Sequence, residues 1–163
     1  MSYEVTINLT IDGVPHSLDV DSERLLLHAL RDDARKTAPK WGCGTGDCGA
    51  CSVVLDDAVV DSCLVYAVEC QDGQITTATA LADTSVGRVV VEELERAGAV
   101  QCGICTPGFL VSIVTGIETL GPAPERAQIT ELLSGNLCRC TGYRPLYDAV
   151  EAAARRLHGG STP

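Results

Sequence analysis

The sequence has few aromatic residues, few basic residues and no long apolar run. Phe, Trp and Tyr make up 4% of the 163 residues, although 45% are hydrophobic, so a core has to be built from aliphatic side chains. Twelve Lys and Arg against 22 Asp and Glu give a formal net charge of -10, which argues against binding to nucleic acid or to an anionic membrane surface. No segment approaches the roughly 18 apolar residues of a membrane span. We therefore expect neither a nucleic-acid partner nor direct membrane insertion.

The first residues also lack the features of a secretory signal. Residues 1–12 alternate polar and apolar side chains, with no basic region followed by a long apolar run. We therefore expect a cytoplasmic protein. In a reducing compartment, the nine cysteines are expected to be metal ligands rather than a disulfide framework.

The first half of the chain has the pattern of a small mixed α+β domain. A hairpin, a helix and two further strands are expected, in this order, over residues 4–20, 23–33, 52–55 and 75–78. Asp12-Gly13 marks the hairpin turn, and Ser22 is a candidate cap for the helix. This combination of elements is typical of ferredoxins.

After about residue 80 the strand pattern disappears and helical spacing takes over. Four helices are expected, over residues 86–97, 106–120, 125–137 and 145–157. Thr106 suits an N-cap and Pro107 suits the first helical position. Helices joined by short links predict a four-helix bundle. The expected domains are residues 1–80 and 81–163, with the bundle over about 85–157 and the boundary within 79–84.

Four cysteines in the first half have the spacing C-x4-C-x2-C-x11-C, and we call them the first set: Cys43, Cys48, Cys51 and Cys63. Plant-type [2Fe–2S] proteins have C-x4-C-x2-C with a more distant fourth cysteine. Such a loop has to wrap a cluster and aim backbone N–H groups at its sulfurs, which requires residues that tolerate positive φ. Four glycines in and beside this loop meet that requirement: Gly42, Gly44, Gly46 and Gly49. The pattern predicts a [2Fe–2S] cluster, with structural zinc as the alternative.

Four cysteines in the second half form the second set: Cys102, Cys105, Cys138 and Cys140. Both pairs lie at ends of expected helices, and Cys105 directly precedes the helix that starts at Thr106. The positive end of that helix is expected to stabilise the Cys105 thiolate. A bundle that brings these ends together offers four thiolates to a second metal centre, for which the spacing leaves zinc open. Cys70 remains, and we expect it to be a small buried apolar residue.

The sequence lacks the motifs of substrate chemistry. It has no Ser-His-Asp order, no G-x-G-x-x-G opening a βαβ unit and no Walker A loop. We therefore expect no catalytic residue in this chain. The residues alone leave three functions open: an electron-transfer subunit of a larger enzyme, a freestanding ferredoxin-like carrier, and a zinc-binding interaction module.

Three segments together resemble the signatures of one family, the small iron–sulfur subunits of the xanthine dehydrogenase (molybdenum hydroxylase) family. They read GCGTGDCGACSV at 42–53, QCGICTPG at 101–108 and GNLCRCTGY at 135–143. The resemblance runs from about Tyr3 to Leu157 in the order found in the family. It implies a plant-type ferredoxin-like (β-grasp) domain followed by an all-α domain. Asp57-Ala58 stands where many members have a glycine-containing turn.

The resemblance also implies a function and partners. The chain would be a non-catalytic electron-transfer subunit beside a large subunit with a molybdenum–pterin (dinucleotide) cofactor and a medium subunit with FAD, expected as a dimer of heterotrimers. Electrons would pass from molybdenum to a [2Fe–2S] cluster on the second set, then to one on the first set, and on to FAD. Gln101 and Cys140 would lie near the pterin. The loop Cys43-Gly-Thr-Gly-Asp-Cys48 favours purine, aldehyde or N-heterocycle substrates over carbon monoxide.

Overall fold

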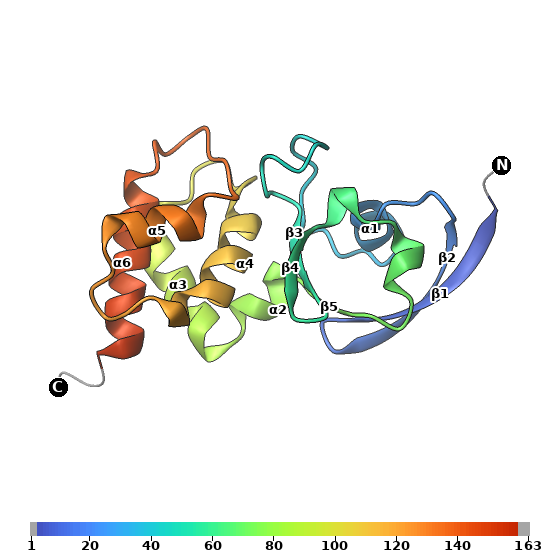
Figure 1. The fold of residues 1–163 in the computed structure, drawn as a ribbon, viewed down its shortest axis with the longest axis horizontal. Helices are drawn as coiled ribbons and strands as arrows, with labels where there is room; N and C mark the ends of the chain where they lie inside the picture. Colours follow the sequence, from blue (N-terminus) through green and yellow to red (C-terminus); the bar gives the residue numbers. More distant parts are fainter. Residues whose placement is uncertain (1–2, 160–163) are drawn as a thin grey trace.

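The computed structural model describes residues 3–159, which form a sheet half and a helical half side by side (Figure 1). The sheet has five strands in the order β2-β1-β5-β3-β4. They are β1 (Glu4–Ile11), β2 (Val14–Asp21), β3 (Ser52–Leu55), β4 (Ala58–Asp61) and β5 (Gln74–Thr76). β1 runs parallel to β5 and antiparallel to β2, while β3 runs antiparallel to both β4 and β5. The expected mixed α+β class is confirmed.

The N-terminal hairpin forms where its alternating polarity predicts it. Ile7, Leu9 and Ile11 of β1 are buried, so one face of the hairpin lies on the core. The turn is made by Asp12 at φ 53° and Gly13 at φ 77°, as the Asp-Gly pair requires. Two positive φ values twist the chain in the sense that the flanking strands need.

A second tight turn joins β3 to β4 without any glycine. Asp56 and Asp57 adopt φ 47° and 68°, in the left-handed region that glycine usually supplies. The Asp56 side chain accepts a 2.8 Å hydrogen bond from the Gln74 backbone N–H on β5, which helps hold this conformation. β4, which the sequence reading did not assign, is thereby added as an edge strand.

The helix expected over 23–33 is shorter and differently wound. It consists of α1 (Leu26–His28) continued by a π-helical turn, η1 (Ala29–Asp33), and Ser22 does not cap it. The reason is a backbone link to residues 65–67: Leu26 N–H donates to Val65 and Ala67 N–H donates to Arg24, both at 2.8 Å. These bonds keep Leu25 extended, so the helix starts at Leu26.

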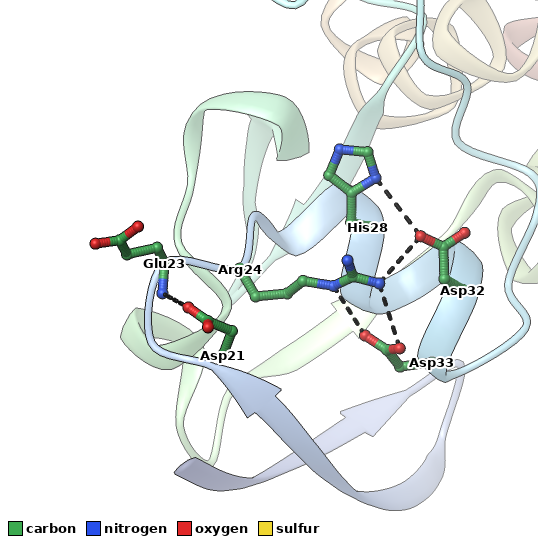
Figure 2. A network of polar contacts seen from close by, with 6 residues as sticks. All are labelled: Asp21, Glu23, Arg24, His28, Asp32 and Asp33. Atoms are coloured by element: carbon green, nitrogen blue, oxygen red, sulfur yellow. Dashed lines mark hydrogen bonds and ion pairs between the residues drawn. The ribbon is translucent and has the colours of Figure 1, made fainter. Parts of the chain in front are cut away.

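An ion-pair network closes η1 onto the turn that precedes α1 (Figure 2). Arg24 contacts Asp33 at 3.1 Å and Asp32 at 3.0 Å, and His28 lies 3.6 Å from Asp32. The Arg24 and Asp33 side chains are each 31% exposed and Asp32 is 56% exposed. Contacts this accessible to solvent contribute at most about 1 kcal/mol.

Two 3-10 turns, η2 (Ser62–Leu64) and η3 (Ala67–Cys70), complete the sheet half. Its core is aliphatic, as the composition requires, and includes Ile7, Ile11, Leu26, Leu30, Val53 and Ile75. Cys70 is 2% exposed and belongs to this core, which confirms its expected role as a small apolar residue.

The helical half contains α2 (Ala78–Ala82), α3 (Ser85–Arg96), α4 (Thr106–Gly116), the 3-10 turn η4 (Ile117–Thr119), α5 (Arg126–Leu133) and α6 (Arg144–His158). α3 packs on α4 and α6, and α5 packs on α4 and α6. One core serves these elements, with Val90, Phe109, Ile113, Leu133 and Val150 among its buried residues. Within residues 3–159 no helix is long and apolar enough to cross a membrane.

The ends of one strand and two helices differ from expectation. The strand expected over 75–78 ends at Thr76, because the Thr77 hydroxyl accepts from Thr79 N–H and caps α2, a helix that the sequence reading missed. α4 gives way to η4 at Ile117. α5 ends at Leu133 rather than 137, because the next residues turn away to form a cysteine loop.

Candidate metal centres

The first cysteine loop, residues 42–51, leads into β3 and owes its shape to glycine. Gly44, Gly46 and Gly49 have φ of 73°, 81° and 62°, as the predicted wrap requires. Gly42 serves a different purpose, because a Cβ there would stand 2.5 Å from the Cys48 sulfur. The Thr45 backbone N–H points at the Cys43 sulfur at 3.4 Å. This loop can therefore surround sulfur ligands closely and direct N–H groups at them.

The thiols of the first set interact in two pairs. Cys48 lies close enough to Cys43 to affect the pKa of the Cys43 thiol, and Cys63 affects the pKa of the Cys51 thiol in the same way. Hydrogen bonds from the side chain and backbone of Thr45 lower the pKa of the exposed Cys43 thiol to about 6. Burial, aided by the neighbouring Asp61 charge, raises the pKa of the Cys51 thiol to about 12. One end of this site thus faces solvent and the other faces the core beside Leu27.

The second set lies at the start of α4 and in the loop between α5 and α6, and it too is paired. Cys140 lies close enough to Cys102 to affect the pKa of the Cys102 thiol, and Cys138 affects the pKa of the Cys105 thiol in the same way. The helices thus bring together pairs of cysteines that are more than 30 residues apart in the chain. Figure 1 places the loops of both sets along one edge of the molecule.

Burial raises the pKa of the Cys105 thiol to about 12. The expected stabilisation of the Cys105 thiolate by the α4 terminus stays a prediction. Cys105 itself occupies the N-cap position, with Thr106 as the first helical residue. At Cys138 burial acts in the same sense, but hydrogen bonds, chiefly from Thr141, leave its pKa below the usual value. Thr141 Oγ1 lies 3.1 Å from the Cys138 sulfur.

Tyr143 shapes the loop that carries Cys138 and Cys140. Its backbone adopts φ 67°, in the left-handed region, and its hydroxyl accepts from Cys138 N–H at 2.9 Å. The same hydroxyl donates to the Asn136 carbonyl at 3.4 Å, and the ring packs edge-on against Phe109. The loop is therefore tied at both ends to a side chain anchored in the helical core.

The two sets lie on either side of the junction between the sheet half and the helical half. Leu137 N–H donates to the Cys48 carbonyl at 3.0 Å, joining a residue beside Cys138 to a member of the first set. A small apolar pocket of about 200 Å³ lies there, with Cys48 and Ala50 among the lining residues from the first loop and Cys102, Cys105 and Cys140 from the second set. Gln101 is exposed next to Cys102.

The paired thiols fit a cluster with two irons. Each [2Fe–2S] cluster takes four thiolates, two on each iron. Both sets supply two pairs, and the Gly42 Cβ test shows that the first loop closes on sulfur. Within residues 3–159 no three His, Cys, Asp or Glu side chains form a group suited to one metal ion.

Comparison with known proteins agrees with this geometry. The model of the 2Fe-2S iron-sulfur cluster binding domain matches residues 9–82, and that of the [2Fe-2S] binding domain matches 77–151. The nicotine 6-hydroxylase small subunit of Paenarthrobacter nicotinovorans is 40% identical over 149 residues, which cover 91% of this chain and 89% of the relative. The chain belongs to the small iron–sulfur subunits of the molybdenum hydroxylases. It is therefore a non-catalytic subunit of an oxidoreductase, with two [2Fe–2S] clusters as its cofactors.

The similarity of this small subunit to two further proteins extends over nearly the whole chain. The nicotinate dehydrogenase small FeS subunit of Eubacterium barkeri is 37% identical, covering 94% of this chain and 97% of the relative. The crystal structure of quinoline 2-oxidoreductase from Pseudomonas putida 86 aligns with a TM-score of 0.86 at 35% identity, covering 98% of this chain and 99% of that one.

Several residues that shape the centres were missed in the sequence. Thr45 and Thr141 donate to cysteine sulfurs, Tyr143 ties the second loop, and Asn136 is a buried amide between the two sets. Each lies within three residues of a cysteine inside a recognised motif. Their place beside the cysteines in the sequence could have marked these residues as candidates. It could not have shown which atoms each side chain contacts.

Proposed function

We propose that this small subunit relays electrons, one at a time, between a molybdenum–pterin cofactor and FAD held by partner subunits. The observation that carries the proposal is the pair of four-thiol sets facing each other across one short junction. Membership of the small iron–sulfur subunits supports the electron-transfer role.

We assign one cluster to Cys43, Cys48, Cys51 and Cys63 and the other to Cys102, Cys105, Cys138 and Cys140. Each cluster, when bound, accepts and donates a single electron. The chain's own residues aim the Thr45 N–H and the Thr141 hydroxyl at sulfur and keep the buried end of the first set, Cys51 and Cys63, away from water. Hydrogen bonds to sulfur and limited solvent access tune the potentials of such centres.

Each set has an exposed member through which electrons can enter or leave, which supports a relay between two partner subunits. Cys102, Cys140 and Gln101 are exposed on the helical half, so this end can meet the molybdenum–pterin subunit. Cys43 is the exposed member of the first set and can face the FAD subunit. We propose electron flow from the second set to the first, with Gln101 and Cys140 nearest the pterin.

We further propose a complex of this chain with a large molybdenum subunit and a medium FAD subunit, assembled as a dimer of heterotrimers. The names of the relatives above refer to nicotine, nicotinate and quinoline, which are all aromatic N-heterocycles, so we expect an N-heterocyclic substrate for the complex.

The division into a ferredoxin-like domain over 1–80 and a four-helix bundle over about 85–157 is also a proposal. Support for the bundle comes from the packing of α3 on α4 and α6 and of α5 on α4 and α6 around one core. The five-stranded sheet with α1 supports the β-grasp assignment for the first domain.

The experiment is to purify the small subunit with the chains that accompany it and to measure iron, molybdenum and FAD. The complex is then mixed with an N-heterocycle such as nicotinate, an aldehyde, or a purine, and reduction of the clusters and flavin is followed by rapid spectroscopy. We expect cluster reduction before flavin reduction with the heterocycle. A stable, solitary cluster-containing protein that binds neither partner would contradict the proposal, and preference for an aldehyde would correct the substrate class.

A further inference from the structure

A buried amide occupies the junction between the two cysteine sets. Asn136 is 2% exposed and lies two residues before Cys138. Its Nδ2 donates to the Gly49 carbonyl at 3.1 Å, and its Oδ1 accepts from the Ser112 hydroxyl at 2.6 Å. Gly49 directly follows Cys48, and Ser112 belongs to α4, the helix that Cys105 precedes. One side chain therefore links three segments, each of which carries a cysteine of the two sets.

The backbone of the neighbouring segments is packed tightly around the Asn136 side chain. A Cβ on Gly49 would stand 2.2 Å from Asn136 Nδ2 and 2.3 Å from the Gly135 carbonyl. A Cβ on Gly108, in the first turn of α4, would stand 2.0 Å from the Gly49 carbonyl. The segments thus meet backbone to backbone around the amide. Such close approach is possible only at glycine.

The amide also stabilises the direct backbone link between the sets. The next residue, Leu137, donates its N–H to the Cys48 carbonyl at 3.0 Å. Ser52 N–H and its hydroxyl also donate to the Gly49 carbonyl, so the amide acts on a carbonyl that the start of β3 already holds. Leaving a buried donor or acceptor without a partner costs more free energy than one hydrogen bond contributes to stability. Opening the junction would leave several such groups unpaired, so their hydrogen bonds favour the closed arrangement.

We propose that Asn136 is a positioning residue for electron transfer: it fixes the separation and relative orientation of the two clusters by clamping the Cys48 and Cys138 loops together across α4. The proposal rests on the proposed two-cluster function and deepens it. The hydrogen bonds of the Asn136 side chain go to the Ser112 hydroxyl and the Gly49 carbonyl, so Asn136 acts through the segments that carry the ligands.

The test uses the purified complex with Asn136→Asp, which keeps the shape and the acceptor for Ser112 but replaces the donor to Gly49 by a carboxylate oxygen. The control is Glu93→Gln, since Glu93 is 3% exposed and joins α3 to α6 away from the junction. The first readout is hydrogen exchange at the Leu137 amide. We expect it to accelerate roughly five- to one-hundred-fold in Asn136→Asp, the range set by one unsatisfied buried group. In Glu93→Gln we expect the wild-type rate at this amide.

The second readout separates positioning from a merely structural role. With both clusters reduced by dithionite, their magnetic dipolar coupling in EPR depends steeply on distance and orientation. We expect the coupling to be weaker or spread over a range in Asn136→Asp and unchanged in Glu93→Gln. If Asn136→Asp does not assemble, Ser112→Ala, which removes only the other hydrogen bond, is measured in the same way and should shift both readouts in the same direction.

Unchanged coupling in an assembled junction variant would overturn the proposal, even if exchange at Leu137 became faster, because the amide would then matter only for stability. If the wild-type complex itself shows fewer than two cluster signals, the proposed function fails instead. The two failures are therefore distinguishable.

Discussion

The two cysteine sets are built in different ways. Three cysteines of the first set come from one ten-residue loop, and Cys51 and Cys63 are buried against the sheet-half core. The second set draws its pairs from two loops separated by α4 and α5, and it has no buried member among its four cysteines. A local loop forms the first site, whereas helix packing forms the second.

The difference in construction predicts which substitutions each site should tolerate. The first site depends on backbone shape within 42–51, where glycine is required by contact with sulfur and by positive φ. The second depends on where helices end and on anchors such as Tyr143. The predictions below test this contrast, from the largest expected effect to the smallest.

Loss of one ligand should remove one cluster and leave the other. In the complex, we expect Cys48→Ala to abolish one of two reduced EPR signals and about half of the bound iron, because each cluster needs four thiolates. Cys138→Ala should remove the other signal. Iron analysis and EPR of the two variants check this. Loss of both signals in either variant would show that the sets do not form independently.

A methyl group at Gly42 should harm the first cluster, whereas one at Gly135 should not harm the second. The Gly42 Cβ would stand 2.5 Å from the Cys48 sulfur, while at Gly135 nothing lies within 4 Å. Overpacking of this kind costs about 1–3 kcal/mol, so iron of the first set should be lost to a chelator roughly five- to one-hundred-fold faster in Gly42→Ala. Equal rates in Gly42→Ala and Gly135→Ala would contradict the steric argument.

Cys70 should be inert and dispensable for both clusters. Burial, with added repulsion from Glu69 and Asp56, raises the pKa of its thiol to about 11, so it stays protonated at pH 8 and becomes a thiolate only as the pH approaches that value. We expect iodoacetamide at pH 8 to label Cys70 only after unfolding, as judged by mass spectrometry. Cys70→Ala should retain both EPR signals. Loss of the first-set signal would place Cys70 among the ligands.

The smallest effect is expected at Arg24, which bridges Asp32 and Asp33 in the sheet half (Figure 2). Arg24→Ala removes contacts to Asp32 and Asp33 that are partly exposed, so the free energy of unfolding should fall by about 1 kcal/mol or less. Thermal unfolding measures this change in free energy. The control is Arg88→Ala, a change at an exposed arginine of α3. A change in either EPR signal would show that this network reaches the clusters.

Much of the fold was predictable because its signals are local. Alternating polarity and Asp12-Gly13 predicted the hairpin, and helical spacing predicted α3, α4 and α6 to within a few residues. The predictions of helix ends failed where hydrogen bonds to distant parts of the backbone determine where a helix starts or stops. Ser22 does not cap α1, because residues 65–67 bond to 24–26, and α5 stops early to release the loop that reaches Cys48.

Cysteine spacing and glycine placement predicted a [2Fe–2S] cluster for the first set, because they constrain what one short loop can wrap, whereas the spacing of the second set left zinc open. The sequence by itself also determined that Cys70 would be left over, since the other eight cysteines fall into two sets. The proximity of particular thiols, the burial of some of them and the contact between the two sets depend on tertiary packing. Those properties depend on contacts such as Asn136 with Gly49, which lie 87 residues apart in the chain and leave no trace in local pattern.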